Sequence, residues 1–242
     1  MRAPVHEDAS RTVTAIYRTL EEQIVRGLLP PSARLPAERQ LSELFATTRI
    51  TLREALGQLE SQGLIYREER RGWFVSPPRV VYNPLVRSHF HAMVTEQGRV
   101  PSTELLSARL IPANSSVCEL LALPALTGVY QIRRTRRIDG RLVLYVEHYL
   151  TPAFFPGLLD NDLTHSLTDL YAQKYGIHYG RVRFDIRPTA LQAEAALALK
   201  VATGSLALHI TRLKRDQRGQ LIDCDLEFWR HDAIHVSVDV PD

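Results

Sequence analysis

Thr48-Arg-Ile-Thr-Leu-Arg-Glu-Ala-Leu-Gly-Gln-Leu59 is the stretch that decides the fold of the first part of this chain. Its apolar residues recur at steps of three and four, which predicts one helix with a single apolar stripe. The stripe consists of Leu52, Ala55, Leu56 and Leu59. Thr48 precedes it, where a hydroxyl can accept a hydrogen bond from a free amide of the first turn. We therefore expect a helix from about Arg49 to Ser61, ended by Gly63.

Two further helices and a hairpin flank this stretch. An amphipathic pattern runs from Thr12 to Leu28 and stops at Pro30-Pro31, and a short helix of about two turns follows Pro36. After the central helix, two short apolar runs are separated by charged residues, which indicates two strands joined by a turn. These runs are Leu64-Ile65-Tyr66 and Arg71-Gly72-Trp73-Phe74-Val75. Three helices and a hairpin predict a winged helix-turn-helix over residues 1–76.

The polar side of the central helix suits DNA. Arg49 and Arg53 lie four residues apart and share one flank, clear of the apolar stripe. Their guanidinium groups can bind phosphates or the edge of guanine, while Ile50 and Thr51 can contact a thymine methyl group or the backbone. This arrangement is typical of a recognition helix.

A solvated helix is the alternative, with Glu54 and Glu60 neutralising the two arginines. Arg39, near the start of the second helix, and the Arg70-Arg71-Gly72 turn add basic donors around the same edge. A solvated helix does not require these donors. Their convergence therefore favours DNA binding.

Four segments together resemble the signature of GntR-family transcription regulators. They are Leu35-Pro-Ala-Glu-Arg-Gln-Leu41, Thr48-Arg-Ile-Thr-Leu-Arg-Glu-Ala-Leu56, Leu59 to Gly63 and Gly72-Trp-Phe-Val75. The resemblance implies a dimeric winged helix on a near-palindromic double-stranded DNA operator. Positions that contact DNA in the family fall here on Arg39, Arg49, Thr51, Arg53 and Gly72, and we add Thr48 and Arg71 as candidates. The wing departs from the common Gly-x-Gly-Thr pattern, so Arg70 or Arg71 can enter the minor groove instead.

The rest of the chain predicts a second, mixed domain. Residues 77–84 are rich in proline and suit a linker, which leaves residues 85–242 for this domain. Asp139-Gly140 and Arg218-Gly219 lie between consecutive strand candidates and suit tight hairpins, so we expect a mostly antiparallel sheet and an α+β fold. Strands are expected at Val129–Ile132, Leu142–Val146, Leu206–Thr211, Leu221–Trp229 and Val236–Val240. Helices are expected at Leu85–Glu96, Ser115–Leu121, Leu163–Lys174 and Leu191–Lys200, the last three covering one face of the sheet.

A second group of polar residues suits a small anion. Arg134 and Arg136 alternate onto one face of a strand, where two guanidinium groups converge. Ser166, at a helix start, adds a hydroxyl and free amides, and Glu147 can bind an amine or a hydroxyl. The alternative is a solvated sheet face on which arginines and carboxylates pair with one another. The residues concerned are Arg134, Arg136, Arg183, Glu147, Asp185 and Asp225.

From Leu85 to its end the chain resembles the HutC subfamily of GntR regulators, whose UTRA domain senses a ligand and is similar in fold to chorismate lyase. The matching residues include Phe90, Gly98, Pro101, Arg134-Thr-Arg136, Glu147, Ser166-Leu167, Tyr175-Gly-Ile177, Arg212 and Trp229-Arg-His-Asp232. The resemblance implies a pocket for a small, often phosphorylated metabolite. Candidate effector-binding residues are Arg134, Arg136, Glu147, Ser166, Arg183 and Trp229. The stretch from Asp223 to Asp232 resembles regulators of phosphonate utilisation, which favours a phosphate ester or a phosphonate such as 2-aminoethylphosphonate.

Composition and motifs exclude several other classes. Apolar residues make up 45% and charged residues 24% of the 242 residues, which is typical of a globular protein. Two cysteines are too few for a disulfide scaffold, so we expect a cytoplasmic protein, and no uncharged run approaches the length of a membrane span. His89 with His91, and His231 with His235, lack further ligands, so no metal site is expected. No P-loop, dinucleotide fingerprint or nucleophile elbow is present, so neither a cofactor nor catalysis is expected.

We therefore expect a cytoplasmic, homodimeric repressor. A small anionic metabolite would displace the two recognition helices through residues 76–84 and release the operator. An effector-independent DNA-binding dimer is one alternative, and an enzyme of the lyase-like fold is the other.

Overall fold

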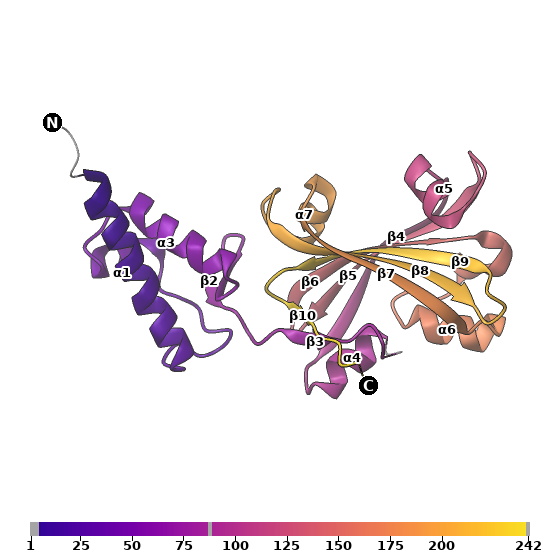
Figure 1. Cartoon of the computed structure of the whole chain (residues 1–242), viewed down its shortest axis with the longest axis horizontal. Coiled ribbons are helices and arrows are strands. Elements are labelled where there is room, and N and C mark those ends of the chain that lie inside the picture. Colours follow the sequence, from indigo (N-terminus) through magenta and orange to yellow (C-terminus); the bar gives the residue numbers. More distant parts are fainter. Residues whose placement is uncertain (1–4, 87–88, 241–242) are drawn as a thin grey trace. The chain divides into compact units, whose positions relative to one another are not determined.

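The computed structural model describes residues 5–86 and 89–240. It divides into two compact units (Figure 1). The first contains Met1–Arg79 and His231–Ala233, and the second contains Val80–Arg230 and Ile234–Asp242. The division at Arg79 falls inside the predicted linker. None of the helices in the described ranges has the length and hydropathy needed to cross a membrane.

The first unit is the predicted winged helix. It contains α1 (Val5–Val25), α2 (Glu38–Leu44), α3 (Arg49–Ser61) and a hairpin of β1 (Ile65–Glu68) and β2 (Gly72–Val75). The apolar stripe of α3 forms the centre of its core, because all four of its residues are fully buried. Residues of α1 and the hairpin, among them Val13, Ile16, Leu20, Ile65 and Val75, pack against this stripe.

Local interactions determine where α3 begins and where the β1–β2 hairpin turns. Thr48 caps α3 as predicted, since its Oγ1 accepts a hydrogen bond from Thr51 N at 3.3 Å. In the hairpin turn Arg70 has a φ of 59° and Gly72 a φ of 99°. Only glycine adopts the second value without strain, so Gly72 fixes where the wing turns back.

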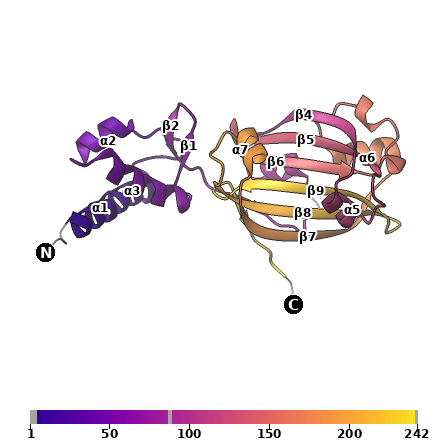
Figure 2. The same ribbon diagram turned by 90° about the horizontal axis from the view of Figure 1, so that it is seen from above.

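The second unit is built on a six-stranded antiparallel sheet, as the sequence predicts. In the order β4-β5-β6-β9-β8-β7 (Figure 2), its strands are β4 (Pro101–Pro112), β5 (Gly128–Ile138), β6 (Arg141–Leu150), β9 (Leu221–Arg230), β8 (Leu206–Asp216) and β7 (Tyr179–Ala190). Asp139 and Gly140 both have positive φ, 49° and 78°, and form the two-residue turn between β5 and β6. The hairpin expected there is confirmed.

The edges of the sheet differ most from the expectation. Strands β4 and β7 were not expected from the sequence, because they are edge strands that are only half-buried, so their apolar pattern is weak. The strand expected at Val236–Val240 is instead β10 (Ile234–Val236), which pairs in parallel with β3 (Val80–Tyr82). Thus part of the predicted linker is a short strand of the second unit.

Helices cover both faces of the sheet, so the expectation of a single covered face was wrong. Figure 1 shows α5 (Ser115–Leu121) and α7 (Ala193–Leu199) on one side, and α4 (Phe90–Glu96) and α6 (Leu167–Tyr175) on the other. The reason is that β5 and β6 carry apolar residues on both faces. Val129, Tyr145 and Tyr149 pack with α5 and α7, whereas Ile132 and Leu150 pack with α6 and the short turns η1 (Pro152–Phe154) and η2 (Leu158–Asp160).

The start of α4 also differs from the prediction. The helix begins at Phe90 rather than Leu85, because His89 caps it by accepting a hydrogen bond from Ala92 N on Nδ1 at 3.3 Å. Residues 87 and 88 of the predicted helix lie outside the described residues.

Replacing Leu56 by alanine should destabilise the winged helix. The side chain is fully buried against α1, so its loss leaves a cavity and should cost about 2–5 kcal/mol of unfolding free energy. Leu44→Ala is the matched control, since Leu44 is 75% exposed and its truncation should change the unfolding free energy by less than about 0.5 kcal/mol. Urea denaturation followed by circular dichroism measures both changes. Equal effects of the two substitutions would contradict the assigned core.

Candidate functional site

The first turn of α3 presents the most accessible groups of the winged helix. Arg49 is exposed and makes no hydrogen bond or ion pair within the described part of the chain. Ile50, which follows it, is 81% exposed. Thr51 is only half-buried, and its Oγ1 lies 3.0 Å from the Oγ1 of Thr48. This turn therefore offers one free guanidinium and one free apolar side chain to a partner.

Arg53 differs from Arg49 because it is already paired. Its Nε donates to Glu38 Oε2 at 2.7 Å, and Trp73 Nε1 donates to Glu38 Oε1 at 3.2 Å. Burial raises the pKa of Glu38, but the hydrogen bonds from Arg53 and Trp73 outweigh it and lower that pKa. Glu38 thus ties α2, α3 and the wing together. The carboxylate that neutralises Arg53 belongs to α2, whereas the solvated-helix alternative assigned this role to Glu54 and Glu60.

The remaining DNA candidates lie around α2 and the wing. Arg39 is exposed on α2, and its Nε lies 3.6 Å from Glu43 Oε1. Arg71 forms an ion pair with Glu68, and its Cζ lies 5.3 Å from the centroid of the Phe74 ring. Arg70, at the tip of the wing, is 92% exposed. Of the two wing arginines, Arg70 is therefore the freer one.

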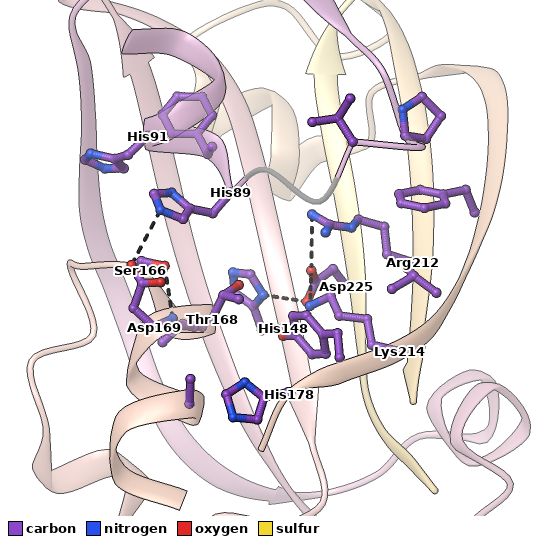
Figure 3. Close-up of a pocket in the computed structure, with 18 of the residues that line it drawn as sticks. His89, His91, His148, Ser166, Thr168, Asp169, His178, Arg212, Lys214 and Asp225 are labelled. Atoms are coloured by element: carbon purple, nitrogen blue, oxygen red, sulfur yellow. Dashed lines mark hydrogen bonds and ion pairs between the residues drawn. The ribbon is translucent and has the colours of Figure 1, made fainter. Parts of the chain in front are cut away.

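The second unit contains a cavity of about 660 Å³ on the face of the sheet covered by α4 and α6 (Figure 3). Arg134, Arg136 and Ser166, three of the six candidate effector residues, line it. It is also lined by five histidines, His89, His91, His148, His165 and His178, and by charged groups that include Asp169, Arg212, Lys214 and Asp225. Apolar side chains such as Phe90, Phe184 and Ile177 complete its wall.

Asp225 is the centre of a buried polar network on the cavity floor. His148 Nδ1 lies 2.6 Å from Asp225 Oδ1, and Lys214 Nζ lies 2.6 Å from Asp225 Oδ2. Arg134 donates to the other nitrogen of His148, from Nε at 3.2 Å and Nη2 at 2.8 Å. Burial lowers the pKa of His148 to about 3, so the ring is neutral and donates its Nδ1 proton to Asp225.

The charges of this floor match one another. Arg212 Nη1 lies 3.0 Å from Glu227 Oε1, and Lys214 Nζ also lies 3.3 Å from Asp223 Oδ1. With Arg134 these are three cations facing three buried carboxylates, Asp223, Asp225 and Glu227. Burial would raise the pKa of Asp225, but His148, Lys214 and Arg212 hold it well below its usual range. The floor therefore needs no ligand to balance it.

Arg136 is a further cation of the cavity, in addition to the three that the buried carboxylates match. Its Cζ lies 4.7 Å from the centroid of the Phe90 ring. Its Nε is buried and has no hydrogen-bond partner in the described residues. Burial and the neighbouring Arg134 lower the pKa of Arg136 to about 9, so it keeps its charge at neutral pH. A half-buried guanidinium that lines a cavity, and whose buried Nε has no hydrogen-bond partner among the described residues, suits an anion.

Ser166 lies at the start of α6, as expected. Its Oγ accepts a hydrogen bond from Asp169 N at 3.2 Å, which leaves the hydroxyl proton free to donate. Asp169, on the same turn, lies with its Oδ2 3.5 Å from His89 Nε2 (Figure 3). This wall of the cavity therefore combines a hydroxyl donor with a carboxylate.

The structure does not bring Glu147 into the cavity. In an unbulged hairpin, Glu147 would lie opposite Ile132 and share the face of Arg134. A β-bulge between Arg136 and Arg137 shifts the register, so Glu147 pairs with Arg133 instead. A slip of one residue turns every following side chain to the other face. On that face Glu147 accepts hydrogen bonds from Tyr145 and Tyr149.

Arg183 and Trp229 also lie outside the cavity wall. Arg183 pairs with Leu213 on β8, so it faces away from Arg212 and Lys214 and is exposed. Trp229 is on the correct face but is buried beneath Phe90, and its Nε1 donates to Glu227 Oε2 at 2.9 Å. Trp229 therefore supports the cavity from below.

Several residues that line the cavity were not expected from the sequence to bind an effector, among them Thr103, His148 and Lys214, and His91 was considered only as a metal ligand. Alternation along β8 and β9 could have found part of this set, because Arg212 and Lys214, like Asp223, Asp225 and Glu227, are spaced two apart. His91 and Thr103 come from a short helix and an edge strand, and only the tertiary structure brings them to Arg136.

Two family descriptions match the chain. "UTRA domain" covers residues 96–235, and "Bacterial regulatory proteins, gntR family" covers residues 12–75. The Escherichia coli protein named uncharacterized HTH-type transcriptional regulator YihL is 31% identical over 232 residues, which are 95% of this chain and 98% of YihL. The HTH-type transcriptional repressor NagR of Bacillus subtilis is 28% identical over 218 residues, 90% of this chain and 89% of NagR.

A solved structure supports the same fold. PhnF from Mycobacterium smegmatis matches with a TM-score of 0.65 and 22% identity over 93% of this chain and 99% of PhnF. The family and the named relatives are transcriptional regulators, not enzymes, which removes the lyase alternative. Together with the winged helix and the second unit, these matches show that the chain belongs to the GntR family of bacterial regulatory proteins and carries a UTRA domain.

Proposed function

We propose that this regulator is a homodimeric repressor that leaves a palindromic operator when a small phosphate ester or phosphonate binds in the cavity of the second unit. The observation that carries the proposal is that Arg136 has no hydrogen-bond or ion-pair partner in the part of the chain that the structure describes, whereas the buried charges of the same cavity are matched. An anionic ligand supplies the missing partner. A DNA-binding dimer without an effector would gain nothing from such a group, because a partly buried cation without a partner for its Nε costs stability.

In the DNA-binding half, α3 enters the major groove. Arg49 reads a guanine edge or a phosphate, and Ile50 contacts a thymine methyl group, because both side chains are free in the first turn. Around them we place Arg39, Thr48, Thr51, Arg53, Arg71 and Gly72, as the family resemblance implies. Arg53 orients α3 through Glu38 and binds a phosphate with its remaining donors.

In the effector-binding half, Arg134 and Arg136 have different roles. Arg136 contacts the anionic group. Arg134 is a positioning residue, because its Nη1 already donates to Leu163 O at 3.1 Å and His165 O at 3.0 Å. These two bonds hold the loop that leads into Ser166, whose hydroxyl is the second donor to the anion.

A compact amine-bearing phosphonate fits this arrangement. For 2-aminoethylphosphonate, the phosphonate binds Arg136 and Ser166, and the amine faces Asp169. Asp169 takes the role that the sequence analysis gave to Glu147, because it is a partly exposed carboxylate that lines the cavity. The name of NagR, a transcriptional repressor, supports repression as the mode of action.

Replacing Arg49 by alanine should weaken operator binding without changing effector affinity. The loss of one guanidinium contact to a base should cost about 1–3 kcal/mol, or roughly 5-fold to 150-fold in Kd. Arg18→Ala is the matched control, since Arg18 is an exposed arginine on α1 outside the proposed interface. Fluorescence anisotropy with DNA from upstream of the gene measures both variants. Equal binding by Arg49→Ala and the wild type would exclude the proposed role of Arg49.

Replacing Arg136 by alanine should abolish binding of 2-aminoethylphosphonate or inorganic phosphate while DNA binding persists, because the unmatched cation is lost. Arg183→Ala, on the opposite face, should bind these ligands as the wild type does. Arg134→Ala should lower the melting temperature instead, because it removes the hydrogen bonds to His148 and to the carbonyl groups of Leu163 and His165. Calorimetric titration and thermal melting separate the three variants. Undiminished ligand binding by Arg136→Ala would refute the anion site.

A further inference from the structure

Three polar side chains from three elements meet at one wall of the cavity. His91 of α4 lies with its Nε2 3.1 Å from Thr103 Oγ1 of β4. Thr103 is directly opposite Arg136 of β5 in the sheet register, so the two side chains share one face. All three residues line the cavity. His91 and Thr103 are therefore next to the position in which we place the anion.

The groups that face His91 are mainly basic. Arg136 and Arg134 face it from β5, His89 from its own helix and His165 from the loop before α6. The carboxylate on this side of the cavity, Asp169 of α6, is directed to His89. Burial, followed by the charge of Arg136, lowers the pKa of His91. In the unliganded protein the ring is therefore neutral at neutral pH.

His91 is freer to change its protonation than its neighbour His89. The Nδ1 of His89 accepts the hydrogen bond that caps α4, so protonation there would break the cap. His91 has one hydrogen-bond partner among the described residues, the hydroxyl of Thr103. A hydroxyl can donate or accept, so this contact is retained when the ring gains a proton.

We propose that His91 is a titrating contact of the anion site, which becomes protonated when the anionic group of the effector occupies the space beside Arg136. The inference rests on the proposed function of this cavity. A phosphoryl or phosphonate dianion carries two negative charges, and Arg136 supplies one positive charge. Protonated His91 supplies the second and donates to an oxygen of the ligand.

The direction of the pH dependence follows from this linkage. An anion beside Arg136 cancels the repulsion that disfavours the protonated ring, so the pKa of His91 is higher in the complex than in the free protein. Between these two pKa values, binding takes up one proton, and affinity falls as pH rises by up to about tenfold per pH unit. The protein therefore binds an anion that stays a dianion at lower concentrations as the pH decreases.

Sulfate is the probe that tests this inference, because it remains a dianion across the whole range and cannot itself titrate. Isothermal titration calorimetry of the full-length protein, from about pH 5.5 to about pH 8, gives its Kd at constant ionic strength. Repeating the titration in two buffers of different ionisation enthalpy counts the protons taken up. We expect sulfate to bind several-fold more weakly at the upper end of the range, with net proton uptake near the middle.

His91→Gln identifies the residue responsible. Glutamine keeps a hydrogen bond to Thr103 but does not titrate, so this variant should bind sulfate as the wild type does at high pH and gain little on acidification. His235→Gln is the matched control, since His235 is exposed on β10 and outside the cavity wall. It should keep the pH slope and the proton uptake of the wild type. Thermal melting of each variant shows whether it is folded.

The outcomes separate this inference from the proposed function. A flat pH profile in the wild type, or an unchanged slope in His91→Gln, overturns the role of His91. In that case, loss of sulfate binding in Arg136→Ala still supports the anion site. Absence of sulfate binding to the wild type at every pH overturns the anion site and His91 together. If His91→Gln does not fold, the absence of proton uptake by the wild type still overturns the role of His91.

Discussion

The matching of buried charges around Asp225 is the constraint on which the second unit depends. Asp225 is 1% exposed and accepts contacts from His148 and Lys214, so the loss of either partner would leave a buried carboxylate poorly compensated. Apolar side chains of α6 cover one part of this face, at Ile132 and Leu150, and the charged part lines the cavity, whereas α5 and α7 pack on the other face with apolar side chains. The cavity under α4 and α6 is thus a consequence of the polar floor.

This constraint explains why two arginines in one short motif act differently. Arg134 and Arg136 share a strand and a face, but Arg134 is fully buried with several acceptors while Arg136 has an aromatic ring and an open cavity. Removing Arg134 is therefore expected to lower the stability of the second unit, whereas removing Arg136 is expected to affect only anion binding. A converging arginine pair therefore does not by itself establish two ligand contacts. The partners of each guanidinium decide its role.

The features that the sequence predicts are those that depend on interactions between residues close together in the chain. The winged helix follows from neighbouring residues: the stripe of α3, the Thr48 cap and Gly72 in the wing are local, and they position Arg49 without further information. The cavity depends on register between distant strands. One bulge between Arg136 and Arg137 moves Glu147 to the wrong face, and periodicity gives no sign of it. The weakly patterned edge strand β4, which supplies Thr103, could not be predicted either.

His91 and His148, two of the histidines that line the cavity, show that partners, rather than residue type, decide which group responds to pH. Both nitrogens of His148 are engaged, one by Arg134 and the other by Asp225, and both bonds require the neutral ring. His91 has a partner that accommodates either protonation state, the hydroxyl of Thr103. An anion placed beside Arg136 changes the potential at both rings, but only His91 can gain a proton without losing a hydrogen bond. Proton uptake by the cavity is therefore expected at its wall, while the floor keeps its charge state and its geometry.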